Sequence, residues 1–208
     1  MSSGPGGPVG WVIFDYGNVI SKPQPAEDIA ALARAAGTGV AEFGAAYWPR
    51  RIDYDRADLD AAEFWGGVAE RLGQRWDDRR IAELARLDAA SWTHLRPGTA
   101  SLIEELSASG QRLAMLSNAP VEVAEVVADL PLLRHFEHLV FSCYVKATKP
   151  DPDCYYAALE LIGARPAETV FIDDRPENVA AASRLGIGAL RFSTPEALRP
   201  QLLALLGR

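Results

Sequence analysis

Carboxylates stand at the ends of two apolar runs in this 208-residue sequence. Asp15 directly follows Trp11–Phe14, and the pair Asp173 and Asp174 directly follows Thr169–Ile172. A buried carboxylate is costly unless a cation or a reaction uses it. Converging carboxylates also repel each other, and hard oxygen ligands with room for water suit Mg²⁺. The pattern therefore indicates a magnesium site.

Polar residues follow two further apolar runs. Ser117 and Asn118 come after Arg112–Leu116, and Lys149 lies in the loop after His138–Phe141. Singly, these residues could be a helix cap or solvated loop residues. Together they offer a point charge and hydrogen bonds to a phosphate. The first carboxylate could then attack phosphorus in line and form an aspartyl-phosphate that water hydrolyses.

The hydrophobic pattern predicts the elements that position these residues. Short apolar segments alternate with helical stretches, which is typical of an α/β fold with a parallel sheet covered by helices. The predicted strands are Trp11–Phe14, Arg112–Leu116, His138–Phe141, Thr169–Ile172 and Ile187–Phe192. The polar residues follow the carboxyl ends of these strands, the edge where open α/β sheets bind ligands.

A helical insertion separates the first two predicted strands, because about 95 residues lie there and a crossover needs only a dozen or more. The predicted helices are Ala26–Ala36, Val40–Tyr47, Leu59–Leu72 and Asp78–Trp92. We expect a flexible tail over residues 1–8, a catalytic core over residues 9–21 and 96–208, and a helical cap over residues 22–95.

Four of the five tryptophans (Trp48, Trp65, Trp76 and Trp92) fall in this insertion. We expect them to build its small core. The alternative is that Trp48 or Trp65 faces a ligand.

The composition argues against a nucleic-acid or anionic-membrane surface, since the net charge is −7 and no basic block appears. No apolar stretch approaches the roughly 20 residues that span a bilayer. The N-terminus lacks a signal-peptide pattern, so we expect a reducing, cytoplasmic environment without a disulfide between Cys143 and Cys154. The expected partner is a small phosphate ester, and the oligomeric state stays open.

The sequence resembles the haloacid-dehalogenase-like (HAD) superfamily. The segments FDYGNVI, LAMLSN, KPDPDCYYAAL and VFIDDRPENVAAASRLG are similar to its four ordered motifs. The insertion after the first motif is similar to the family's type 1 cap. The resemblance implies a Rossmann-like sheet and Mg²⁺-dependent phosphatase activity.

Matched motif by motif, the resemblance implies the nucleophile and the metal ligands. Asp15 would be both the nucleophile and a metal ligand. Gly17 would give its backbone carbonyl to the metal, and Asp174 would be a direct ligand.

The resemblance also implies the groups that bind the phosphoryl oxygens. Ser117 and Lys149 would bind them, with Asn118 alongside. Asp173 would pair with Lys149 or with a metal-bound water, and Asn178 would help to order the acidic loop.

Gly17 departs from the family's pattern, because most of its phosphatases have there a second Asp that protonates the leaving oxygen. A subset with DxGNV in the first motif includes sugar-phosphate phosphatases, which makes a sugar phosphate the favoured substrate. One hypothesis is a leaving group that needs little protonation. The other hypothesis is a substitute acid from the cap, either from the run Arg50–Asp55 or from His94. We expect, however, that this run is mostly a solvated turn and that His94 is structural.

Three other functions compete with the phosphatase interpretation. A metal-independent 2-haloacid dehalogenase also uses Asp15-type attack, but the pair Asp173 and Asp174 favours the phosphatase. A binding or regulatory module without turnover has no evident reason to keep costly carboxylates. A phosphomutase would need an acid/base carboxylate near position 17.

Overall fold

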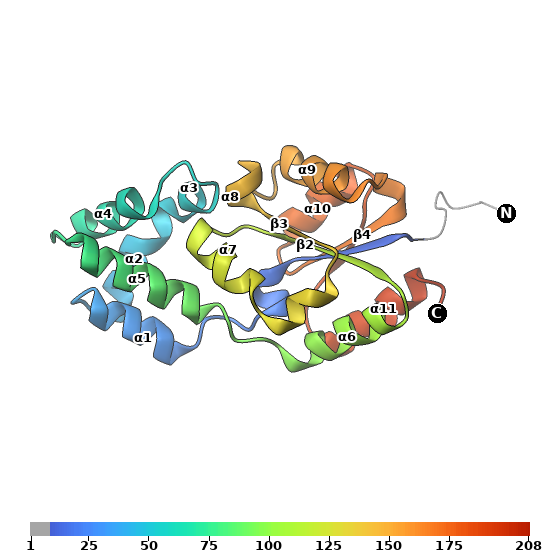
Figure 1. Cartoon of the computed structure of the whole chain (residues 1–208), viewed down its shortest axis with the longest axis horizontal. Helices are drawn as coiled ribbons and strands as arrows, with labels where there is room; N and C mark the ends of the chain where they lie inside the picture. The colour runs from blue at the N-terminus through green and yellow to red at the C-terminus, as the bar shows by residue number, and fades with distance from the viewer. Residues whose placement is uncertain (1–8) are drawn as a thin grey trace.

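The computed structural model describes residues 9–208 as two lobes that are joined by two segments of chain (Figure 1). The tail predicted for residues 1–8 lies outside the described residues.

One lobe is built on a five-stranded parallel sheet with strand order β3-β2-β1-β4-β5. The strands are β1 (Trp11–Phe14), β2 (Arg112–Ser117), β3 (His138–Phe141), β4 (Thr169–Asp173) and β5 (Gly188–Arg191). This confirms the predicted α/β, Rossmann-like fold. Because β1 is central, the residue that follows it lies in the middle of the sheet's carboxyl edge.

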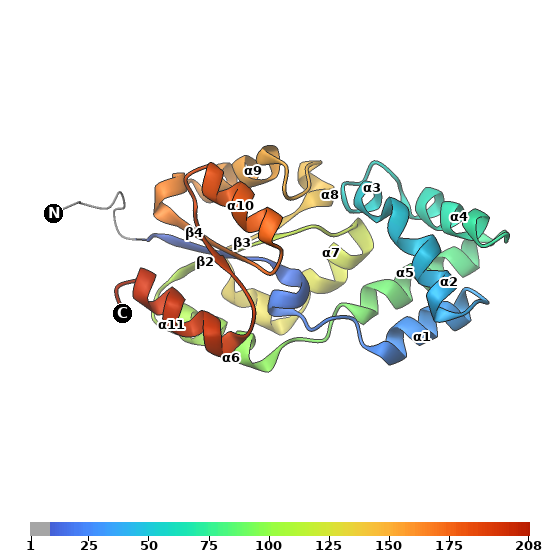
Figure 2. The ribbon, with the colours of Figure 1, turned by 180° about the vertical axis from the view of Figure 1, so that it is seen from behind.

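Helices cover both faces of this sheet (Figure 2). The helices α6 (Pro97–Ala108), α7 (Val121–Ala128) and α11 (Pro195–Leu205) cover one face. The helices α9 (Pro152–Ile162) and α10 (Pro176–Arg184) cover the other. Burial on both faces explains why the strands read as nearly continuous apolar runs.

The second lobe consists of helices from the long insertion. They are α1 (Ala26–Ala35), α2 (Val40–Tyr47), α3 (Arg51–Asp55), α4 (Ala61–Arg71) and α5 (Asp78–Ser91). Trp65 is fully buried in the hydrophobic cluster of this lobe, and Trp76 packs against that cluster. These two tryptophans have the core role that we expect for them.

The two segments between the lobes run side by side. Lys22 N donates to His94 O at 2.7 Å, and Arg96 N donates to Ile20 O at 2.8 Å. This pairing lies at the ends of the predicted insertion. It supports the division into cap and core at residues 22 and 95, which stays a prediction.

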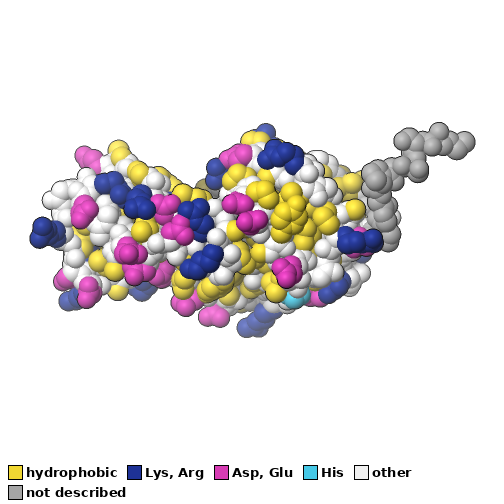
Figure 3. Space-filling model, turned by 90° about the horizontal axis from the view of Figure 1, so that it is seen from above, with side chains coloured by type: hydrophobic (Ala, Val, Ile, Leu, Met, Phe, Trp, Pro, Cys, Tyr) yellow, Lys and Arg dark blue, Asp and Glu magenta, His cyan; other side chains and the backbone are white. Residues whose placement is uncertain are grey.

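Acidic and basic side chains are mixed over the face of the molecule seen in Figure 3. Within residues 9–208, no helix is long and apolar enough to cross a membrane. Cys143 and Cys154 are free and buried. The cytoplasmic location stays a prediction.

Candidate active site

The register of the sheet brings three strand ends together. Phe14 pairs with both Met115 of β2 and Ile172 of β4. Asp15, one residue further, donates its backbone N–H to Ile172 O at 2.8 Å. Asp15 and Asp173 therefore lie next to each other, with the end of β2 on the other side of β1.

The chain turns sharply after Asp15, whose Oδ1 accepts a hydrogen bond from Tyr16 N at 2.7 Å. Asn18 has φ 59°, a conformation that Asn adopts more readily than most residues. Its Nδ2 donates to Asp174 Oδ2 at 3.2 Å. The turn thus connects the first motif to the acidic pair after β4.

Lys149 joins two of the carboxylates and is itself buried. Its Nζ lies 2.6 Å from Asp15 Oδ1 and 2.8 Å from Asp173 Oδ2. Its backbone is held by Asn118, whose Nδ2 donates to Lys149 O at 3.0 Å and whose Oδ1 accepts from Lys149 N at 2.9 Å. Asn118 thus fixes the loop that carries the lysine, while its predicted contact with substrate stays a prediction.

Asp173 is fully buried and is held from several sides. Asn178 Nδ2 lies 3.0 Å from both of its carboxylate oxygens, and Arg175 N donates to Oδ1 at 2.8 Å. Asp173 therefore orients Lys149 from beneath the pocket. Asn178 orders the acidic loop, as the sequence motif implies.

Burial raises the pKa of Asp15 to about 7, against the opposing effect of Lys149 and with a further increase from Asp173. Burial would lower the pKa of Lys149, but the carboxylates of Asp15 and Asp173 outweigh this and hold it above its usual value. Burial, followed by Asp173, raises the pKa of Asp174. The ionised carboxylates of Asp15 and Asp174 therefore need a further cation beside them for full stabilisation.

The site fits a divalent metal. Carboxylate oxygens of Asp15, Asp173 and Asp174 lie within 4.8 Å of one another. Three carboxylates and one ammonium leave two negative charges uncompensated, and oxygen donors suit Mg²⁺. Within residues 9–208, the buried Oδ1 of Asn178 beside this cluster has no hydrogen-bond partner.

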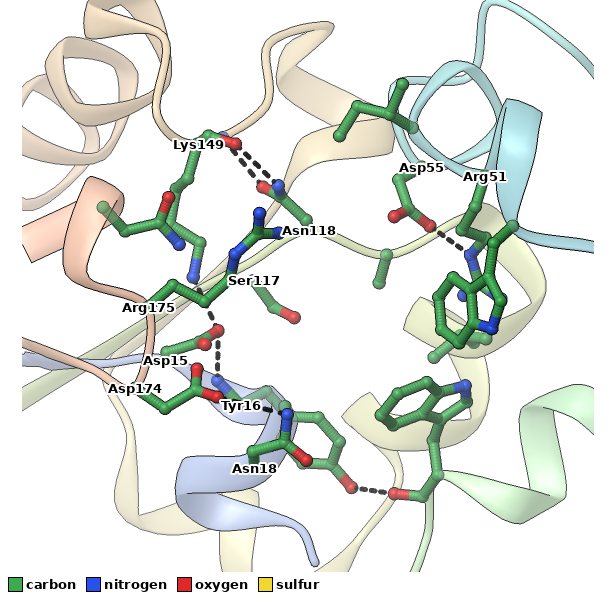
Figure 4. Close-up of a pocket in the computed structure, with 17 residues that line it drawn as sticks. Asp15, Tyr16, Asn18, Arg51, Asp55, Ser117, Asn118, Lys149, Asp174 and Arg175 are labelled. Atoms are coloured by element: carbon green, nitrogen blue, oxygen red, sulfur yellow. Dashed lines mark hydrogen bonds and ion pairs between the residues drawn. The ribbon is translucent and has the colours of Figure 1, made fainter. Parts of the chain in front are cut away.

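A pocket of about 250 Å³ opens above these groups, shown in Figure 4. Most of the predicted site residues line it, namely Asp15, Gly17, Ser117, Asn118, Lys149 and Asp174. A pocket of this size approaches the ~300–1,000 Å³ usual for small-molecule sites. It therefore holds more than a phosphate group.

The cap closes the far side of this pocket, where the structure corrects a sequence-based expectation. The run Arg50–Asp55 is not a solvated turn, because Arg51 and Asp55 are buried and line the pocket. Arg51 Nε bonds Asp55 Oδ1 at 2.7 Å, and its Nη1 bonds Asp88 Oδ2 at 2.9 Å. This pairing is what allows the charged side chains to be buried.

The sequence predicts that all four tryptophans of the insertion form the core of the cap, but two of them line the pocket instead. Trp48 is 55% exposed and lines the pocket, as does Trp92. His94 lies away from the pocket lining and bonds Asp28 Oδ2 at 2.6 Å. Trp92 was missed as a pocket residue because the sequence pattern places it at the end of a helix, without indicating which way its ring faces.

Comparisons with known proteins identify the family of this chain. A family model described as haloacid dehalogenase-like hydrolase matches residues 10–186. The sesquiterpene phosphatase astK of Aspergillus oryzae is 26% identical, over 94% of this chain and 95% of its own. The (S)-2-haloacid dehalogenase of Xanthobacter autotrophicus is 27% identical, over 93% of this chain and 79% of its own.

Another relative matches over a shorter range. Flavin mononucleotide hydrolase 1 of Arabidopsis thaliana is 30% identical over 105 residues, which is 50% of this chain but only 43% of that protein. The chain therefore matches less than half the length of this relative.

Solved structures share the fold. A protein from Porphyromonas gingivalis, described as a predicted HAD-like family hydrolase, superposes with a TM-score of 0.76 at 24% identity, covering 97% of this chain and all of that one. A HAD family enzyme from Bacteroides thetaiotaomicron, in complex with magnesium and inorganic phosphate, gives 0.66 at 22% identity, covering 89% of this chain and 94% of that one. Since the family match spans well over half of the chain, this protein belongs to the haloacid dehalogenase-like hydrolases.

Proposed function

We propose that this hydrolase is a Mg²⁺-dependent phosphatase that hydrolyses a small phosphate ester, with a sugar phosphate favoured, through an aspartyl-phosphate on Asp15. The observation that carries the proposal is the cluster of Asp15, Asp173 and Asp174 around Lys149. It combines a nucleophile, a cation and a set of oxygen ligands at the floor of one pocket.

In the first step, a carboxylate oxygen of Asp15 attacks phosphorus from the floor of the pocket. The bond from phosphorus to the leaving oxygen breaks, and its electron pair goes to that oxygen, which takes a proton from water. An ammonium has three donors. Lys149 uses two of them to hold Asp15 and Asp173, and its charge offsets the negative charge of the phosphoryl oxygens.

In the second step, water attacks phosphorus and the bond to Asp15 breaks. This restores the carboxylate and releases phosphate and a proton. Asp15, Asp174 and the backbone carbonyl of Gly17 are the groups that would hold Mg²⁺. When bound there, the metal would neutralise part of the negative charge on the phosphoryl oxygens.

The rival haloacid dehalogenation fits the site less well. A 2-haloacid brings its own carboxylate, which must lie close to the nucleophile. Here that neighbourhood already contains Asp173 and Asp174, and Lys149 bonds two carboxylates. A dehalogenase of this type works without a metal, and without a metal these like charges disfavour a substrate carboxylate.

A phosphate-release screen tests the proposal. Sugar phosphates, nucleotides, phosphoamino acids and acyl phosphates are incubated with Mg²⁺ and either the wild type or Asp15→Asn. We expect phosphate release by the wild type and a fall of kcat on the order of a thousandfold or more in the variant, because the amide is not a nucleophile. EDTA should abolish the wild-type rate, and excess Mg²⁺ should restore it.

The control variant is Asp129→Asn, which changes an exposed carboxylate outside the pocket lining and should keep wild-type activity. Equal trace rates in the wild type and Asp15→Asn would contradict the proposal. So would chloride release from a 2-haloacid in the presence of EDTA.

A further inference from the structure

The wall of the pocket that faces the nucleophile is built by the cap helix α3. In Figure 4, Arg51 and Asp55 lie across the cavity from Asp15 and Asp174, with open space between the two groups. In-line displacement places the leaving oxygen on the side of phosphorus away from Asp15. The leaving group therefore extends towards α3.

Arg51 is not free to bind a second anion on this wall. Its guanidinium bonds Asp55 at 2.7 Å and Asp88 at 2.9 Å, and both carboxylates are buried. The guanidinium also lies 5.2 Å from the ring centre of Tyr47 and 5.8 Å from that of Tyr54. Two carboxylates share one guanidinium, so Arg51 has no charge left for a further anion when both carboxylates are ionised.

Asp55 presents an acceptor to the pocket. Its bond to Arg51 uses Oδ1, and the residue lines the same cavity as Trp48 and Trp92. A carboxylate accepts hydrogen bonds and cannot donate them. The indole rings add apolar area against which a carbon skeleton can pack.

The other arginine of the pocket lies at the opposite end. Arg175 lines the pocket, and Figure 4 shows it on the same side of the cavity as Lys149, across from Arg51. Its side chain is 57% exposed and is paired with Glu177, with Nε 2.7 Å from Oε1. Arg175 therefore pairs with Glu177 and not with Asp55.

We infer that Asp55 is a specificity-determining residue that accepts a hydrogen bond from an uncharged, hydroxylated leaving group, and that phosphate esters with a second anionic group are rejected. This inference rests on the proposed phosphatase function. It narrows the substrate class to esters of neutral alcohols that carry a further hydroxyl.

Two substrates of nearly equal size test this inference, 2-hydroxyethyl phosphate and 2-phosphoglycolate. They differ at the far end of the leaving group, where one has a hydroxyl and the other a carboxylate. We expect the wild type to favour 2-hydroxyethyl phosphate in kcat/KM by at least about tenfold, because a carboxylate would face Asp55. This ratio is measured on the wild type alone and so requires no folded variant.

Asp55→Asn removes the charge and nearly keeps the shape. The preference should fall by at least about fivefold, mainly through a lower KM for 2-phosphoglycolate. The matched control is Asp53→Asn on the same helix, where the carboxylate pairs with exposed Arg50, and it should keep the wild-type ratio. Thermal unfolding of both variants checks that they are folded.

Hydrolysis of p-nitrophenyl phosphate distinguishes a failure of the inference about Asp55 from a failure of the proposed phosphatase function. If the wild type hydrolyses it but prefers 2-phosphoglycolate, or if folded Asp55→Asn keeps the wild-type ratio, the inference is overturned and the phosphatase function stands. If the wild type hydrolyses neither 2-hydroxyethyl phosphate nor 2-phosphoglycolate, the inference is overturned, and the phosphate-release screen decides separately whether the phosphatase function stands.

Discussion

Gly17 has ordinary backbone angles, with φ −62° and ψ 128°. A Cβ at this position would find its nearest neighbour, a ring carbon of Trp92, at 3.9 Å. The backbone and the surrounding space therefore accept a larger residue here. Nothing in the local geometry requires glycine. What glycine changes is the chemistry, because position 17 then has no carboxylate that could donate a proton.

Gly17→Asp should supply the missing proton donor. We expect the rate for an alkyl phosphate, whose leaving group needs protonation, to rise by up to about a hundredfold. The wild type should show a steep dependence of rate on the pKa of the leaving group across a series of aryl phosphates. The variant should show a shallower one.

Gly17→Asn is the matched control, because it has nearly the same size and no acidic proton. It should keep the steep dependence on leaving-group pKa. A shallow dependence in the wild type would show that a proton donor is already present, and the hypothesis of a missing acid would then be wrong.

The residues at the floor of the site could be predicted because their positions follow from strand ends. Asp15, Ser117 and Asp173 each end an apolar run, and parallel strands bring such ends to one edge. Asp55 could not be predicted in this way. Its burial depends on Arg51 and, through it, on Asp88, a residue from another helix that the local sequence does not reveal.

Helix α3 is held against the core by side chains of several elements. Tyr54 OH donates to Glu122 Oε2 of α7 at 2.6 Å, and Lys146 Nζ donates to Ala57 O at 3.1 Å. Ser142, in α8 (Ser142–Val145), accepts from Ala119 N at 2.9 Å and donates to Asp55 O. One buried hydroxyl thus joins the loop after β2 to the cap wall of the pocket.

Ser142→Ala should weaken this connection between the loop after β2 and helix α3. It leaves Ala119 N and Asp55 O without their partner, at a cost of about 1–3 kcal/mol for each buried unsatisfied group. We expect a lower free energy of unfolding, a higher KM and faster hydrogen exchange at residues 51–56. Urea unfolding, steady-state kinetics and exchange monitored by mass spectrometry measure these quantities.

Ser109→Ala provides the comparison, since it loses a hydrogen bond to Leu106 O at the end of α6 and leaves the pocket unchanged. It should lower stability without changing KM or exchange at α3. Exchange at residues 51–56 that is equal in Ser142→Ala and the wild type would show that Ser142 does not hold the cap helix.

Regular elements were easier to predict than their mutual contacts. Glycines follow three of the helices, and Gly110, Gly163 and Gly186 have positive φ, as C-terminal caps require. The short helix α3 was not predicted, since five residues dense in charge show no apolar periodicity. Tertiary contacts to α7 and α8 determine its place over the pocket.

The two cysteines lie on opposite faces of the sheet. Cys143 belongs to the hydrophobic cluster on the side of α6 and α11, and Cys154 to that on the side of α9 and α10. Burial raises the pKa of the Cys143 thiol from 9.0 to about 11 and that of Cys154 to about 12. The fold therefore favours the protonated thiols.

This preference links stability to pH in a definite direction. The contribution of the thiols to the free energy of unfolding is complete below about pH 9 and is lost as the pH rises through about 11 and 12. At pH 8, we expect neither thiol of the native protein to react with an aromatic disulfide reagent. Both should react at the same urea concentration if the two faces unfold together.

Cys143→Ser and Cys154→Ser, made one at a time, assign each reaction to its thiol. Reaction of one thiol at a urea concentration where the other stays protected would show instead that the two sides of the sheet unfold separately.

Because β1 is the central strand, the site can assemble only after the strands that pair with β1 have been translated. The strand that carries Asp15 is translated first, but Trp11 pairs with Arg112 and Thr169. Pairing between such distant segments is slow, because a long loop must close first. A nascent chain that ends before β4 has Asp15 but lacks Asp173 and Asp174, the two carboxylates at the end of that strand. On the ribosome, Asp15 is thus made before the other residues of the acidic cluster, and it stays without its acidic neighbours until β4 has been translated.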